Sequence, residues 1–242
     1  MDEPQKQIQS KQQPWRWKDI GFIFLAAFVL ILVLEGTLWE LLPPDTPLHA
    51  VRVYVRLLIT GCSLIGAVCL VDHVRTQIVW GRGVSWRGFG LALGLALALR
   101  LLSVLFVLLI HLLEIQLHLP LQTRHLQPYL LSWHGMIALA FLVGILTPFA
   151  EELLFRGVLY TFLRQRWKLA LSTGVNSAIY AVLHTDPSVI PLIFLLGVCC
   201  SLLYEYSRRL WLPILLHSFY NLSGLLILFS TTIEREQFPA LP

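Results

Sequence analysis

Charged residues are scarce in this chain of 242 residues. Asp, Glu, Lys and Arg together make up 13% of it, whereas hydrophobic residues make up 57%. A soluble globular domain carries about a quarter charged residues. Long polar loops are also missing, which leaves no room for a separate soluble domain. The composition therefore predicts an integral membrane protein with the lipid bilayer as its surroundings.

Signals of several other protein classes are missing as well. Four cysteines, Cys62, Cys69, Cys199 and Cys200, lie within apolar runs, and their spacing matches no zinc-finger or disulfide framework. The formal net charge of +4 would suit nucleic-acid binding only if the cations gathered on one water-facing element. No such element is long enough here, so we expect no nucleic-acid partner. Gly-x-Ser-x-Gly, His-Glu-x-x-His and phosphate-binding glycine loops do not occur either.

Apolar runs dominate what is present, and they predict an all-α, polytopic membrane helix bundle of about seven to eight transmembrane helices. The fourth run has roughly 31 residues and would measure about 46 Å as a helix, more than the hydrocarbon core of about 30 Å. It must therefore tilt, kink or protrude, and Pro148 is the natural kink. The predicted spans are 20–42, 51–71, 89–113, 134–165, 169–184, 188–206 and 210–230.

The cations between the spans predict the orientation of the chain. If the N-terminus is cytoplasmic, the basic tail, loop 72–88, the stretch from Arg164 to Lys168, and Arg208-Arg209 all lie on the inner side. This satisfies the positive-inside rule. Splitting run 134–165 into two spans would place Arg208-Arg209 outside, which favours one kinked helix. We expect a bacterial inner membrane.

Two charged residues inside the N-terminal spans need partners. Glu35 lies in the first span and Arg100 lies near mid-depth in the third. A charged group at membrane depth costs several kcal/mol and is usually paired. We expect Glu35 and Arg100 to pair with each other.

The fourth span carries a second charged group, in the stretch 147–156. Glu152 and Arg156 are four residues apart, so on a helix they share a face and can form an ion pair. Glu151 lies about 100° around the axis from Glu152 and is free for another task. A purely structural ion pair remains the alternative interpretation.

Two further spans carry buried polar pairs. His184 ends the fifth span with Asn176 and Tyr180 on the same face, and His217 and Asn221 are four apart in the last span. Each pair alone is typical of hydrogen bonds between membrane helices. Polar residues at comparable depth on three helices should, however, converge on one water-filled cavity. The set suits hydrolysis, with groups to take a proton from water and donors to hold an oxyanion.

In chain order these residues resemble the motifs of the CAAX protease and bacteriocin-processing family of intramembrane proteases. The resemblance covers about residues 134–225, and one departure is Tyr180, where the family typically has Phe. It implies an endopeptidase that cuts near the end of a membrane-tethered peptide or protein. The matching motifs are Glu151-Glu152-x-x-x-Arg156, Tyr180-x-x-x-His184 and His217-x-x-x-Asn221.

The resemblance also implies roles for the matched residues. Glu151 and His184 would activate the attacking water. His217 and Asn221 would stabilise the tetrahedral oxyanion. Glu152 and Arg156 would hold the site together and orient the substrate. The chain would then divide into a cytoplasmic tail (1–19), N-terminal helices (20–133), a catalytic core in the C-terminal half (134–230) and a short tail (231–242).

Three alternatives stay open at this point. His184, His217 and Glu151 would make a plausible zinc set, although we favour a mechanism without a metal or other cofactor. A transporter or ion relay could use the same buried groups, but it predicts broken helices in matched halves, and only Pro148 hints at that. A non-catalytic immunity or scaffold protein would be expected to lack a catalytic residue, and none is missing.

Overall fold

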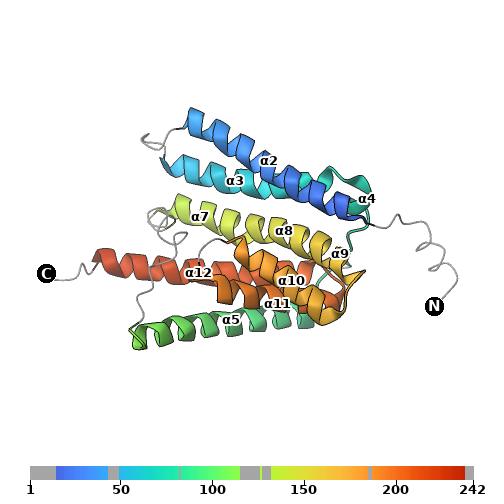
Figure 1. Ribbon diagram of the computed structural model, residues 1–242. Helices are drawn as coiled ribbons and strands as arrows, with labels where there is room; N and C mark the ends of the chain where they lie inside the picture. The colour runs from blue at the N-terminus through green and yellow to red at the C-terminus, as the bar shows by residue number, and fades with distance from the viewer. Residues whose placement is uncertain are drawn as a thin grey trace.

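The computed structural model describes residues 15–42, 49–81, 83–114, 126, 132–184 and 187–237. Within these ranges the regular structure is entirely helical (Figure 1). The long fourth helix is numbered in five consecutive parts because its hydrogen-bond register changes along its length. The helices are α2 (Trp17–Leu41), α3 (His49–Cys69), α4 (Asp72–Arg75), α5 (Trp86–Leu112), α7 (Trp133–Phe141), η2 (Leu142–Leu146), α8 (Thr147–Glu152), η3 (Leu153–Tyr160), α9 (Thr161–Arg164), α10 (Leu169–Val182), α11 (Ile190–Ser207) and α12 (Trp211–Gln237).

Six of the described helices are long and apolar enough to cross a membrane, which confirms the predicted all-α membrane bundle. The run expected as a fifth span is shorter. Helix α10 has 14 residues and measures about 21 Å, less than the hydrocarbon core of about 30 Å. It packs against α11, and the turn between them lies well short of the far end of the bundle (Figure 1).

The stretch from Trp133 to Arg164 forms one helix of 32 residues, as predicted. This long helix lies between the α2–α3 pair and the α5–α12 pair (Figure 1). It contacts α3 on one side and α12 on the other. Its C-terminal half also contacts α10 and α11. Its central position brings the segment with the two glutamates against three other helices.

The register of the long helix changes on both sides of α8. The flanking segments η2 and η3 have π-helical geometry, with hydrogen bonds to the residue five positions back. Each π segment is followed by a threonine, Thr147 or Thr161, whose hydroxyl donates to a carbonyl five residues back at 2.9 Å. The irregularity expected at Pro148 therefore takes the form of a register change, which is frequent at functional sites.

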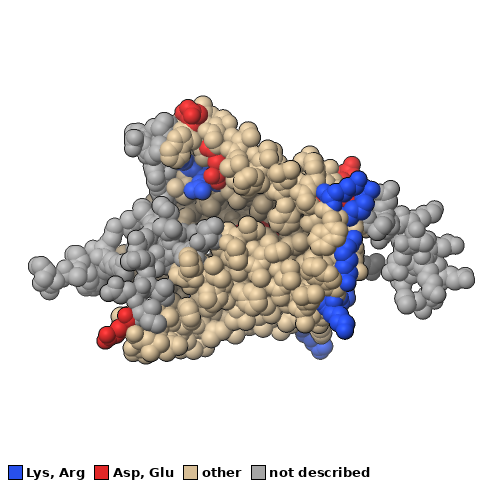
Figure 2. All heavy atoms as spheres, viewed as in Figure 1, with Lys and Arg blue, Asp and Glu red and all other residues tan. Residues whose placement is uncertain are grey.

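Lysine and arginine gather at one end of the bundle, where α2 and α12 begin and α9 and α11 end (Figure 2). At this end Glu205 of α11 accepts hydrogen bonds from Arg164 at 2.9 Å and from Arg208 at 2.8 Å. These contacts tie the end of the long helix to α11. The asymmetry is the charge distribution that the loop sequences predict.

The predicted pair between Glu35 and Arg100 is wrong. Glu35 pairs with Arg56 of α3, with Nε and Oε1 3.1 Å apart. Arg100 of α5 instead donates to the Ser223 hydroxyl at 3.0 Å and to the backbone carbonyl of Tyr220, both on α12. The expected pairing fails because α2 and α5 lie on opposite sides of the bundle (Figure 1).

Candidate active site

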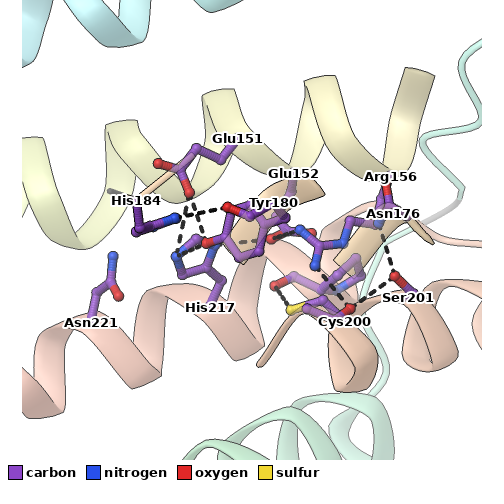
Figure 3. A network of polar contacts seen from close by, with 12 residues as sticks. Glu151, Glu152, Arg156, Asn176, Tyr180, His184, Cys200, Ser201, His217 and Asn221 are labelled. Carbon is purple, nitrogen blue, oxygen red and sulfur yellow. Dashed lines mark hydrogen bonds and ion pairs between the residues drawn. The ribbon is translucent and has the colours of Figure 1, made fainter. Parts of the chain in front are cut away.

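The structure brings the polar residues of three helices together near the middle of the long helix (Figure 3). Glu151, Glu152 and Arg156 come from α8 and η3. Tyr180 lies in the last turn of α10 and His184 in the turn that follows it, and His217 and Asn221 come from α12. Figure 3 shows Glu151, His184 and Asn221 toward one end of this network and Arg156, Asn176 and Ser201 toward the other.

Glu152 and Arg156 form the ion pair that their spacing predicts. Nη1 and Oε1 are 2.7 Å apart, and both side chains are 0% exposed. Arg156 also donates through Nη2 to the Gly197 carbonyl at 3.0 Å, and its guanidinium lies 4.8 Å from the centre of the Tyr180 ring. Residues of three helices thus hold the arginine. A buried charge is tolerated when it is paired and hydrogen-bonded in this way.

A polar chain continues from Arg156 into α11, a helix to which the sequence analysis assigned no functional residue. The Gly197 carbonyl also accepts from Ser201 at 2.8 Å, and Ser201 accepts from Asn176 at 3.1 Å. A Cβ at position 197 would lie 3.0 Å from the Cβ of Ser177, so glycine allows α10 and α11 to approach closely. In the sequence, Gly197 and Ser201 are two small residues four apart, a spacing typical of membrane helix interfaces. This spacing could have indicated the contact.

His217 is buried between the two carboxylates. Its Nδ1 lies 2.9 Å from Oε1 of Glu152, and since a carboxylate only accepts, Nδ1 carries the hydrogen. In the neutral ring Nε2 is then unprotonated. That nitrogen lies 3.3 Å from the Tyr180 hydroxyl and 3.9 Å from Oε2 of Glu151.

Glu151 is the accessible carboxylate of the pair. Its side chain is 17% exposed, whereas that of Glu152 is fully buried. Oε2 of Glu151 accepts from the Tyr180 hydroxyl at 2.8 Å. Among the described residues no group is hydrogen-bonded to Oε1 of Glu151, so this oxygen is available to another molecule.

His184 lies at the end of α10 with its ring against Tyr180. Its Nδ1 is 3.0 Å from the backbone carbonyl of Tyr180. The two rings meet edge to face with their centres 4.8 Å apart. Because a carbonyl only accepts, Nδ1 carries the hydrogen and Nε2 of the neutral ring is free to accept. The described contacts link His184 to Glu151 through Tyr180 rather than directly.

Asn221 is held by a carbonyl that the long helix leaves unpaired. Its Nδ2 donates to the Val143 carbonyl at 2.9 Å. In the register of η2 the donor for that carbonyl would be the nitrogen of Pro148, which has no hydrogen. The carbonyl freed by Pro148 therefore fixes Asn221, and the second amide hydrogen of Asn221 remains available.

The same geometry does not fit the zinc alternative. Among the described residues no three His, Cys, Asp or Glu side chains are grouped closely enough to hold one metal ion. The Tyr180 hydroxyl lies within hydrogen-bonding range of both Glu151 and His217, in the space where an ion joining these two ligands would lie. The set His184, His217 and Glu151 thus does not converge on a common point.

Comparison with known proteins gives a match to one family model and to individual membrane proteins. Residues 132–223 match a family model described as Type II CAAX prenyl endopeptidase Rce1-like. "Membrane-embedded CAAX protease MroQ" of Staphylococcus aureus (strain USA300) is 36% identical over 95 residues, which are 37% of this chain and 38% of that protein. "Putative membrane peptidase YdiL" of Bacillus subtilis (strain 168) is 28% identical over 86 residues, which are 36% of this chain and 34% of that protein. No solved structure matches.

The alignments therefore span little more than a third of either relative. The matched region runs from the residue before α7 to Ser223 of α12 and contains every residue of the network. It coincides with the stretch whose three motifs resemble the family in the sequence alone. Over residues 132–223, this chain is therefore similar to the Rce1-like CAAX prenyl endopeptidase family.

Proposed function

We propose that this protein is an intramembrane endopeptidase that hydrolyses a peptide bond near the end of a membrane-tethered substrate. The observation that carries the proposal is the difference between two adjacent glutamates. Glu152 is fully buried and committed to Arg156 and His217. Glu151 is partly exposed and keeps one carboxylate oxygen free. Carboxylates placed in different surroundings commonly divide the tasks of a hydrolytic site.

Glu151 is the proposed general base. Its free Oε1 takes a proton from a water molecule, and the resulting hydroxide attacks the carbonyl carbon of the substrate. The same carboxyl group then returns the proton to the leaving amine, so the overall step consumes one water. His184 accepts a second hydrogen bond from this water through Nε2 and so orients it.

The proposed oxyanion donors are Asn221 and His217 on α12. Asn221 offers the amide hydrogen that Val143 does not use. His217 donates through Nε2 in its protonated form, because Nδ1 is committed to Glu152. Donors fixed in advance by other contacts are most effective at stabilising a developing charge. Glu152 and Arg156 act here by holding His217 in place.

The depth of the site defines the class of substrate. Glu151 lies about 27 Å along the long helix from its first residue, near the middle of a bilayer-spanning element. A peptide can reach this depth only if it is anchored in the membrane, by a lipid group or by an apolar helix. We therefore propose a membrane-anchored peptide or protein as substrate. A bacterial inner membrane, with the N-terminus cytoplasmic, accounts for the basic end of the bundle.

Glu151→Gln tests the proposal. Glutamine keeps the size of the side chain and can hydrogen-bond to Tyr180, but it cannot take a proton from water. We expect wild-type protein in proteoliposomes to cleave a membrane-anchored reporter peptide after exhaustive chelation. The variant should lose about 10²–10⁴-fold in rate, the usual contribution of a positioned base.

Glu40→Gln is the matched control, because Glu40 is exposed on α2 and far from the site along the chain. This variant should cleave like the wild type. Undiminished cleavage by folded Glu151→Gln would reject the assigned base. Cleavage that chelation abolishes and zinc restores would replace the metal-free mechanism.

A further inference from the structure

We propose that Tyr180 is a positioning residue that holds the carboxylate of Glu151 in its reactive orientation through a hydrogen bond. The inference rests on the proposed function, and it concerns a hydroxyl that phenylalanine at this position would lack. On this proposal, the contact of Tyr180 on α10 with Glu151 on the long helix controls how the base reacts.

The contact itself is direct. The Tyr180 hydroxyl donates to Oε2 of Glu151 at 2.8 Å, a distance typical of a hydrogen bond to a carboxylate. Its oxygen is also 3.3 Å from Nε2 of His217. The hydroxyl therefore stands between the proposed base and the proposed oxyanion donor, and it occupies one of the two carboxylate oxygens. The other oxygen, Oε1, is left as the proton acceptor.

Packing fixes the position of this hydroxyl. Tyr180 is 0% exposed. Its ring meets Phe155 edge to face at 4.9 Å between centres and His184 at 4.8 Å, and Arg156 lies against its face. A phenylalanine would make the same ring contacts. The tyrosine thus differs from it only in the donor that it presents to Glu151.

The other charged and titratable groups around Glu151 do not supply such a donor. On its own helix, Glu152 repels it and Arg156 is bound to Glu152 and Gly197. On α12, Nε2 of His217 is 3.9 Å away. His184, which follows α10, directs its Nδ1 to a backbone carbonyl. A hydrogen bond donated to a carboxylate favours its charged form, so loss of this donor should favour protonation of Glu151.

Tyr180→Phe gives a measurable signature. The acid side of the pH profile of kcat/KM should move to higher pH by on the order of one unit. The rate should fall most at the acid end of the profile, and it should recover toward the wild-type rate as the pH is raised. KM should change little, because the ring and its packing contacts are preserved. A role in packing alone would not move the pH profile.

Tyr204→Phe is the matched control. Tyr204 is another buried tyrosine, whose hydroxyl contacts Thr161 outside the network, so its removal should leave the profile unchanged. A Tyr180→Phe profile with the wild-type shape overturns the proposal, whether the rate is normal or uniformly reduced.

A second readout is independent of cleavage. Infrared difference spectra can follow the protonated-carboxyl band of Glu151, identified by its loss in Glu151→Gln, during a pH titration. The midpoint of that band should be higher in Tyr180→Phe than in the wild type, and equal midpoints overturn the proposal. If the wild type cleaves nothing, the proposed function fails while this measurement still decides the role of Tyr180.

Discussion

Adjacent residues on one helical turn have very different surroundings in this bundle. Glu152 faces the interior and accepts hydrogen bonds from Arg156 and His217 through the same oxygen, Oε1. Glu151, rotated by about 100°, faces the accessible side of the site. A buried carboxylate at membrane depth is tolerated only when it is paired and hydrogen-bonded. The pair with Arg156 is therefore a structural requirement, and it leaves Glu151 available for the role that we propose for it.

Arg156→Ala should destabilise the protein as well as inactivate it. Removing one partner of a buried ion pair leaves the other charge uncompensated and costs about 3–5 kcal/mol. We expect a clearly lower melting temperature in detergent or lipid nanodiscs. Arg87→Ala, at an exposed position near the start of α5, should melt like the wild type. If Arg156→Ala also did so, a direct role in orienting the substrate would become the better explanation.

The sequence predicts some of these residue contacts and not others. The pair of Glu152 with Arg156 follows from helix geometry alone, since residues four apart share a face. The partners of Glu35 and Arg100 depend on which helices lie side by side, and the spacing of residues within one helix carries no such information. The contact of Tyr180 with Glu151 joins residues 29 positions apart and was missed for the same reason.

At the scale of single elements, the register changes of the long helix position the site. Pro148 has no N–H, so one carbonyl in the preceding turn lacks its helical partner. The π register of η2 makes this the Val143 carbonyl, which accepts from Asn221. The two π segments themselves were not predicted. Apolar periodicity distinguishes 3.6 residues per turn from two, but a few wider turns leave the pattern almost unchanged. The threonine that follows each π segment is a local sign of them.

Gly144→Ala tests the contact between η2 and α12. An added Cβ would lie 2.4 Å from Cδ2 and 2.8 Å from Cγ of Leu222, so α12 must shift or the leucine must rearrange. Asn221 directly precedes Leu222, so a shift of Leu222 should displace Asn221. A displacement on the order of 1 Å in a catalytic group lowers the rate by about 100-fold, and we expect a loss of cleavage of that size. The measurement is cleavage by monodisperse protein.

Gly174→Ala provides the comparison within α10. An added Cβ at this position meets nothing within 4 Å, and alanine favours a helix over glycine by about 0.5–1 kcal/mol. This variant should cleave normally and melt no lower than the wild type. Equal activity of the Gly144 and Gly174 variants would show that the seating of α12 on η2 does not control the site.

At the scale of the whole molecule, the helical class and the order of the spans follow from composition and hydropathy. The number of full crossings does not, because α10 is shorter than its apolar run indicates. The predicted orientation does not depend on whether α10 crosses the membrane fully. Helices α10 and α11 form a hairpin that begins and ends at the same end of the bundle (Figure 1), so α12 starts on the same side whether or not α10 crosses.

Reporter fusions test the orientation. The gathering of cations at the end where α2 begins (Figure 2) predicts a cytoplasmic N-terminus and a C-terminus on the opposite side. In a bacterial host, alkaline phosphatase fused to the C-terminus should be active, and a fluorescent protein that folds only in the cytoplasm should fluoresce at the N-terminus. The reverse result for both fusions would contradict the predicted orientation.

The shortness of α10 has a consequence for how a hydrolytic reaction is supplied inside a lipid phase. A helix that ends within the bilayer leaves its last carbonyls without partners within the helix. Lipid cannot satisfy those carbonyls, so such ends persist only beside protein or water. The His184 side chain serves the Tyr180 carbonyl, and the backbone amides of Leu183 and His184 serve those of Ile179 and Ala181. Among the described residues this leaves the Val182 carbonyl, for which water is the natural partner. The end of α10 would thus keep a small hydrated volume next to Glu151. Water, which the bilayer core excludes, would then be held beside the residue proposed to use it.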